Sequence, residues 1–173
     1  MKMTRPIDSR EDAWPARAAK LVMVAALSVF GLLVAFNNVT DYRSNFLFVR
    51  HVLSMDTTFS GNRLMWRAIS AEWAWHALYA LIIVGEAATG VAFAVAAYAM
   101  VRAFRGDGAA FARAKRFVPL GTALGFLVWF FGFSVVGGEW FVMWQSPTWN
   151  GQQPAFRFFI TMLAVCIYVM QEE

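Results

Sequence analysis

The sequence is poor in the residues from which most soluble enzymes build their sites. Charged residues make up only 15% of the chain, histidine occurs twice and cysteine once. An average soluble domain is about 25% charged, so the chain lacks the polar surface of a soluble monomer. The single cysteine, Cys166, excludes an internal disulfide and any cysteine-based zinc or iron–sulfur site within one chain.

Familiar catalytic signatures are also missing. The sequence contains no HExxH motif, paired-cysteine pattern, phosphate-binding glycine loop or nucleophile elbow. An enzyme of a familiar kind is therefore not expected, and no cofactor or metal is predicted. His51 and His76 are two ligands that a haem or a copper ion would accept, but hydrogen bonding near a membrane surface is the simpler role for each.

Apolar residues are abundant. They make up 60% of the chain, and the mean hydropathy is +0.51. In a soluble protein the net charge of +4 would indicate nucleic-acid binding, but here the basic residues flank long apolar runs, as they do in membrane proteins. We therefore expect an integral membrane protein that contacts the lipid bilayer and no nucleic acid.

Four apolar runs approach or exceed the roughly 20 residues that a spanning helix needs. They predict an all-α, four-helix bundle that forms one domain over residues 21–173, after an N-terminal segment at 1–20. The predicted spans are residues 18–36, 71–104, 117–136 and 154–171. A cleaved signal peptide is the alternative for the first run, but polar residues follow it rather than a small-residue cleavage site.

The basic residues indicate an orientation, because cytoplasmic segments carry an excess of Lys and Arg. Five lie in the linkers at 37–70 and 137–153 or close to the latter, at Arg43, Arg50, Arg63, Arg67 and Arg157. Ten lie in the N-terminal segment and around the linker at 105–116, at Lys2, Arg5, Arg10, Arg17, Lys20, Arg102, Arg105, Arg113, Lys115 and Arg116. We therefore expect both termini and the linker at 105–116 to be cytoplasmic, and the linkers at 37–70 and 137–153 to be periplasmic.

The linker at 37–70 is too polar to span a bilayer, yet it is rich in large apolar residues. Phe46, Val49 and Leu53 recur at helical spacing and predict a short amphipathic helix at the membrane surface, with a second one after the turn at 60–62. These helices either cap the bundle or form a docking surface or lid. The candidate residues for that surface are Phe46, Phe48, His51, Trp66, Trp140 and Trp144.

Glu86 lies deep inside the second span, where an ionised carboxylate is costly unless it is paired or hydrated. No Lys or Arg lies in the middle of an apolar run to pair with it. A protonated or hydrogen-bonded carboxyl group is therefore expected. Its candidate partners are Thr122, Trp129, Ser134 and Thr161.

Glu86 shares one stripe of the helix with Glu72, His76 and Tyr79, because the four residues are separated by four, three and seven positions. His76 is also placed to pair with Glu72 one turn earlier. The stripe is interpreted either as a structural polar seam inside the bundle or as a path for a proton or a polar ligand.

Small residues recur along the third span at Gly121, Gly125 and Gly132. Their spacing of four and seven positions allows two helix backbones to approach closely. Either a helix of the same chain or a partner protein would fill this packing groove.

Several blocks carry a resemblance to a known family. They are Asn38-Val-Thr-Asp-Tyr42, Asn45-Phe-Leu-Phe-Val49, His51-Val-Leu-Ser-Met-Asp56, Trp66-Arg-Ala-Ile69, Glu139-Trp-Phe-Val-Met-Trp-Gln-Ser146 and Trp149-Asn-Gly151. In them the chain resembles a bacterial family of predicted small integral membrane proteins catalogued as a domain of unknown function. The resemblance covers nearly the whole chain and implies a four-helix protein of the bacterial inner membrane, without a catalytic residue to carry over.

Two classes of function stay open at this point. The first is a non-enzymatic accessory or assembly subunit of a larger inner-membrane complex, in a hetero- or homo-oligomer, which the aromatic linkers and the small-residue groove favour. The second is a small carrier or sensor that binds a lipid-soluble or protonatable ligand near Glu86, with His76 and Tyr79 at the entrance. A haem or metal enzyme is a third and more distant possibility.

Overall fold

The structure is a computed structural model that describes residues 9–172, with side chains from Trp14 onward. The described residues form helices and loops and contain no β-strand. The elements are α1 (Ser9–Thr40), α2 (Tyr42–Ser54), η1 (Met65–Arg67), α3 (Glu72–Ala103), α4 (Gly108–Ala114), η2 (Lys115–Phe117), α5 (Val118–Phe126), η3 (Leu127–Trp140), η4 (Met143–Gln145) and α6 (Gln152–Met170).

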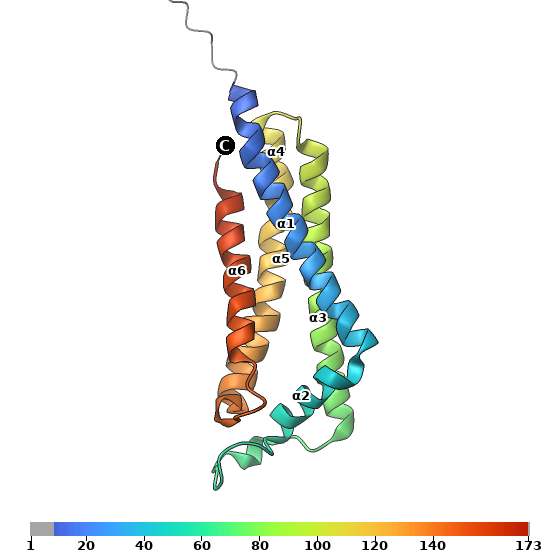
Figure 1. Ribbon diagram of the computed structural model, residues 1–173, viewed down its shortest axis with the longest axis vertical. Helices are drawn as coiled ribbons and strands as arrows, with labels where there is room; N and C mark the ends of the chain where they lie inside the picture. Colours follow the sequence, from blue (N-terminus) through green and yellow to red (C-terminus); the bar gives the residue numbers. More distant parts are fainter. Residues whose placement is uncertain (1–8, 173) are drawn as a thin grey trace, which may run out of the picture.

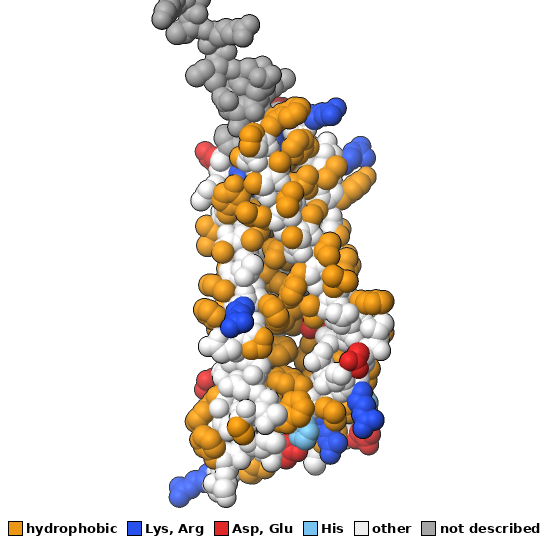
Figure 2. All heavy atoms as spheres, in the orientation of Figure 1, with side chains coloured by type: hydrophobic (Ala, Val, Ile, Leu, Met, Phe, Trp, Pro, Cys, Tyr) orange, Lys and Arg blue, Asp and Glu red, His pale blue; other side chains and the backbone are white. Residues whose placement is uncertain are grey.

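Four helical stretches of the described chain are long and apolar enough to cross a membrane. They are Trp14–Thr40, Glu72–Ala103, Gly108–Trp140 and Gln152–Met170. At most a third of the most apolar window of each is buried inside the structure, and apolar side chains cover much of the surface between the two ends (Figure 2). This outward apolar surface suits lipid contact. The prediction of an all-α fold with four spanning helices is confirmed.

The four long helices run side by side along the long axis of the molecule (Figure 1). The start of α1 and the end of α6 lie at one end of the bundle, with α4 close by. The short helix α2 and the loops that follow it close the opposite end. We call these the terminal end and the α2 end.

Helices α1 and α3 make the most extensive contact between two helices. They cross at two glycines, because a Cβ atom added to Gly31 would lie only 2.9 Å from the Cα of Gly90. At the same level the hydroxyl of Ser28 donates a 3.0 Å hydrogen bond to the carbonyl of Gly90. Glycine therefore permits the two backbones to touch here, as small residues do at interfaces between membrane helices.

Three of the four long helices extend beyond their predicted spans at one end or both, whereas α3 stays within 71–104. The helix α1 runs from Ser9 to Thr40 rather than over 18–36, because the polar residues on both sides of the apolar run continue the same helix. The third long helix passes residue 136 and ends at Trp140. Of the basic residues counted at the N-terminus, Lys2, Arg5 and the side chain of Arg10 lie outside the described part.

The third long helix changes its winding along its length. From Leu127 to Trp140 it is a π-helix, η3, and the amide of Phe141 still bonds the carbonyl of Val136 five residues earlier. A π-helix is rare and is found mostly as single turns near functional sites. This segment contributes one wall of the site described below.

The linker between the first two spans folds as one helix and one turn. In α2, Val49 and Leu53 are buried, as an amphipathic helix requires. The second helix expected in this linker is only the single 3₁₀ turn η1. The turn η1 ends at Arg67 because the backbone is extended from Ala68. In this extended segment the amide of Ile69 donates a hydrogen bond to the carbonyl of Leu53 in α2.

Two separate groups of buried side chains form the core. One lies toward the terminal end and includes Phe93, Met100 and Met162. The other lies under α2 and includes Leu53 and Tyr79. The candidate site lies where the two groups meet.

Candidate functional site

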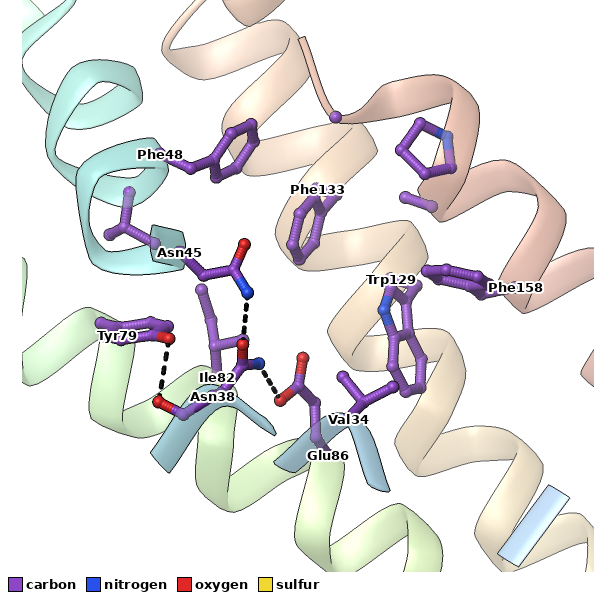
Figure 3. Close-up of a pocket in the computed structure, with 14 residues that line it drawn as sticks. Val34, Asn38, Asn45, Phe48, Tyr79, Ile82, Glu86, Trp129, Phe133 and Phe158 are labelled. Atoms are coloured by element: carbon purple, nitrogen blue, oxygen red, sulfur yellow. Dashed lines mark hydrogen bonds between the residues drawn. The ribbon is translucent and has the colours of Figure 1, made fainter. Parts of the chain in front are cut away.

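A cavity of about 240 Å³ lies between α1, α2, α3, η3 and α6. Figure 3 shows the residues that form its walls. The space-filling view in Figure 2 shows a hollow in the surface nearer the α2 end, with atoms of an acidic side chain inside it. The residues that line it are Val34, Asn38, Asn45, Phe48, Val49, Tyr79, Ile82, Glu86, Trp129, Phe133, Gly151, Pro154, Ala155 and Phe158.

Glu86 is the only acidic residue among the described residues that line this cavity, and it is 2% exposed. At about 1.5 Å per residue it lies about 21 Å along α3 from Glu72. Its Oε2 accepts a 2.7 Å hydrogen bond from the side-chain amide of Asn38, in the last turn of α1. The other carboxylate oxygen points toward the open centre of the cavity (Figure 3).

Asn38 also contacts α2 through a second hydrogen bond of its side chain. Its side-chain oxygen accepts a 2.5 Å hydrogen bond from the amide of Asn45, so the side chains of Asn45, Asn38 and Glu86 form a chain across three helices. Its backbone carbonyl, at a helix end that leaves carbonyls without an intrahelical partner, accepts a 3.2 Å hydrogen bond from the hydroxyl of Tyr79. Asn38 is thus the central residue of the site.

Aromatic side chains form the opposite wall. Trp129 and Phe133 lie four residues apart in the π-helix η3, and both face the cavity. Trp129 is 2% exposed, and its indole nitrogen lies on the cavity side of the ring (Figure 3). This N–H group has no hydrogen-bond partner within residues 9–172, so it is available as a donor to a bound molecule.

The chemistry of the site follows from this lining. Glu86 supplies a carboxylate oxygen, Asn45 an amide oxygen and Trp129 an N–H donor. Five aromatic rings surround these groups, and none of the described lining residues is a Lys or an Arg. An acid without a base, among aromatic faces, suits a group that donates hydrogen bonds or carries positive charge.

The structure separates the predicted polar stripe of α3. Tyr79 and Glu86 reach the cavity, whereas Glu72 is exposed. His76 is also exposed, and its Nδ1 lies 2.7 Å from the hydroxyl oxygen of Tyr42. Its Nε2 is 3.9 Å from the Glu72 carboxylate, a distance at which the expected pair is only loosely formed.

The side chains of the predicted docking or lid surface do not form one continuous patch, because they contact different neighbours. Phe46 stacks on His76, and Phe48 stacks on Phe133 at the cavity. His51 stacks on Trp149 and bonds Asp56. The remaining three tryptophans, Trp66, Trp140 and Trp144, are 70%, 47% and 48% exposed.

Arg67 joins two of those tryptophans. Its guanidinium lies 5.2 Å from the ring of Trp66 and 4.7 Å from that of Trp140. It also donates a 3.2 Å hydrogen bond to the Trp140 carbonyl. The two linkers at the α2 end are therefore held together through Arg67.

The glycines of the third long helix have different neighbours. A Cβ on Gly121 would meet Phe93 of α3, and one on Gly125 would meet Met162 of α6. These two glycines therefore serve packing within the chain. Gly132 meets only the backbone of its own helix, so a side chain there would enter open space.

Glu86 has a different partner from those expected. The hydroxyls of Thr122 and Thr161 donate to carbonyls four residues earlier in their own helices. Trp129 does line the cavity, whereas Ser134 does not. Asn38 and Asn45 are not among the partners predicted from the sequence, although Asn38 directly follows the end of an apolar run and its position there was a usable signal.

The two histidines do not approach a common site. His51 lies with Asp56 and Trp149, and His76 with Tyr42 and Phe46. Within the part of the chain that the structure describes, no three His, Cys, Asp or Glu side chains gather closely enough to hold a metal ion.

Comparison with known proteins places the chain in a family. The family model described as "predicted small integral membrane protein (DUF2165)" matches residues 16–172. No curated protein and no solved structure matches the chain. The chain therefore belongs to the DUF2165 family of small integral membrane proteins, a multi-pass family whose function is unknown.

Proposed function

We propose that this protein is a small carrier or sensor that binds a lipid-soluble, protonatable ligand at Glu86. The observation that carries the proposal is the pairing of a buried acid with a cavity. One oxygen of Glu86 is held by Asn38, and the other faces about 240 Å³ of space. A carboxylate in a membrane helix marks a functional site by default, because its burial is costly.

The lining favours an amine or a hydroxyl as the ligand's polar group. Such a group donates to the carboxylate of Glu86 and to the side-chain oxygen of Asn45, while a hydroxyl also accepts from the indole of Trp129. A protonated amine gains further from the aromatic rings, which attract cations through their faces. An anionic group has no cationic side chain to meet among the described lining residues.

The test uses hexylamine that carries a photoreactive diazirine on its last carbon, with the purified protein in lipid nanodiscs. After illumination, mass spectrometry locates the labelled residues. We expect labels on the cavity residues Phe133 and Phe158, and a loss of about tenfold in Glu86→Gln, because a neutral hydrogen bond has roughly half the strength of a charge-assisted one.

The matched control is Glu72→Gln, which removes an exposed carboxylate from the same helix. Labelling of the cavity should be unchanged in this variant. Equal labelling in the wild type and Glu86→Gln, with both proteins monodisperse, would overturn the proposal.

A second candidate function is that of an accessory or assembly subunit of a larger membrane complex. It is favoured by the exposure of Trp66, Trp73, Trp140 and Trp144 around the α2 end. Gentle purification of the tagged protein from its own membrane, followed by mass spectrometry, tests it. A stoichiometric partner that persists in Glu86→Gln supports the subunit, and a preparation without partners contradicts it.

For the location we propose the bacterial inner membrane, with both termini in the cytoplasm. Helix ends at the terminal end of the bundle carry Arg17, Lys20, Arg102 and the basic residues of the linker at 105–116. The α2 end carries fewer basic residues. The excess of Lys and Arg on cytoplasmic segments supports this orientation.

A further inference from the structure

A second and larger cavity lies beside the first. It has a volume of about 470 Å³ and is formed by α2, α3, α5 and η3. The two cavities share Phe48, Val49, Ile82 and Phe133 in their walls. We call the second cavity the tail groove. The described residues that line it carry apolar side chains or, as glycine, none, and they include Leu81, Leu124, Leu127, Phe131, Gly132 and Met143.

The first cavity is small for a complete ligand. Sites for small molecules usually enclose about 300–1,000 Å³, whereas the cavity at Glu86 encloses about 240 Å³. It has room for a polar head group and little more. The remainder of a lipid-soluble molecule must therefore extend through the shared wall or into the surrounding lipid.

The tail groove has the chemistry of a hydrocarbon site. Its rim includes Leu81 on α3 and Leu127 and Phe131 on η3, each more than half exposed. In a chain that spans a membrane, such side chains face lipid rather than water. Gly132 adds depth, because it presents no side chain to the space beside it.

We propose that the ligand is an amphipathic molecule with an amine head and a single hydrocarbon tail, the head at Glu86 and the tail in the tail groove. This inference rests on the function proposed above and names the class of its ligand. Among the described residues of the first cavity there is one acid, Glu86, and no Lys or Arg, and this lining favours an amine as the head group. The apolar lining of the second cavity and its opening toward lipid select the tail, which enters from the membrane between α3 and η3.

The experiment compares two probes that have the same head. The short probe is the hexylamine diazirine already described, and the long probe is dodecylamine with its diazirine on the last carbon. Both are illuminated with the wild-type protein in nanodiscs. The short probe should label the cavity at Glu86, whereas the long probe should label tail-groove residues such as Leu124 and Met143.

The variant Gly132→Leu tests the groove directly, because its new side chain fills open space inside it. Labelling of the groove by the long probe should fall at least fivefold, while the short probe still labels the first cavity. The control is Gly108→Leu, which adds the same side chain to open space at the start of α4. Leu81→Trp is a second variant, which narrows the exposed rim of the tail groove without changing a buried residue.

The outcomes separate the two proposals. In one outcome the short probe labels the first cavity in a Glu86-dependent way, but the long probe labels outer helix faces and neither Gly132→Leu nor Leu81→Trp has an effect. The tail groove is then not the site of the ligand's tail, while the proposed ligand site at Glu86 stands. If neither probe depends on Glu86, the ligand site itself is wrong and the inference falls with it. Groove labelling that both variants and Glu86→Gln reduce supports the inference.

Discussion

The side-chain amide of Asn38 donates a 2.7 Å hydrogen bond to the carboxylate of Glu86, and both side chains are at least 96% buried. The bond joins the last turn of α1 to the interior of α3. It fixes one oxygen of Glu86, the acid that lines the cavity, and leaves the other directed at the open space (Figure 3). The same amide side chain holds Asn45, so the position of α2 depends on it too.

The first prediction concerns this link. Asn38→Ala removes the donor to Glu86 and the acceptor of Asn45, which leaves the buried carboxylate of Glu86 without its partner and the more exposed Asn45 without its acceptor. We expect the free energy of unfolding to fall by about 1–3 kcal/mol, measured by SDS titration in mixed micelles. Thr161→Val is the control, because the hydroxyl of Thr161 bonds only the backbone of its own helix. Equal losses in the two variants would show that the link contributes nothing specific.

The second prediction concerns the crossing of α1 and α3. Gly90→Val places a side chain against the backbone of Leu32, which lies within 2.7 Å of the added Cβ. The two helices must separate, and we expect destabilisation of about 1–3 kcal/mol or more. Size-exclusion profiles and SDS titration measure the loss. Gly108→Val, where nothing lies within 4 Å of the added Cβ, should behave like the wild type.

The third prediction concerns Arg67, which lies against Trp66 and Trp140. Arg67→Ala removes two cation–π contacts of about 0.5–1 kcal/mol each, so residues 62–69 should exchange amide hydrogens on the order of tenfold faster. Arg67→Lys should not restore protection, because an ammonium lacks the planar group that stacks on both rings. Arg63→Ala changes a nearby exposed arginine. Its exchange profile should match that of the wild type.

The fourth prediction concerns orientation, and the single native cysteine makes it easy to test. In a Cys166→Ser background, Ser60→Cys adds a thiol to an exposed loop at the α2 end, and Gly108→Cys adds one at the terminal end. An impermeant thiol reagent applied to spheroplasts should label Ser60→Cys and spare Gly108→Cys. The reverse pattern would place both termini outside the cytoplasm.

The sequence by itself determined the membrane character, the four long helices and the isolated acid. These properties are local: an apolar run of about 20 residues becomes a spanning helix because its backbone must satisfy its own hydrogen bonds in lipid. The amphipathic helix α2 was equally predictable from the spacing of Phe46, Val49 and Leu53, because its polarity follows a single period. Glu86 was identifiable as an isolated acid because it lies deep inside an apolar run and no basic residue lies in the middle of such a run.

Only the tertiary structure decided what Glu86 contacts and what surrounds it. Helical periodicity assigns residues to faces but does not say which faces meet, and here the contact of Gly31 with Gly90 sets how α1 lies on α3. That contact brings Asn38 to Glu86, in preference to the partners expected from the third and fourth spans. The two adjoining cavities likewise lie between several helices, an arrangement that no single run of the sequence encodes.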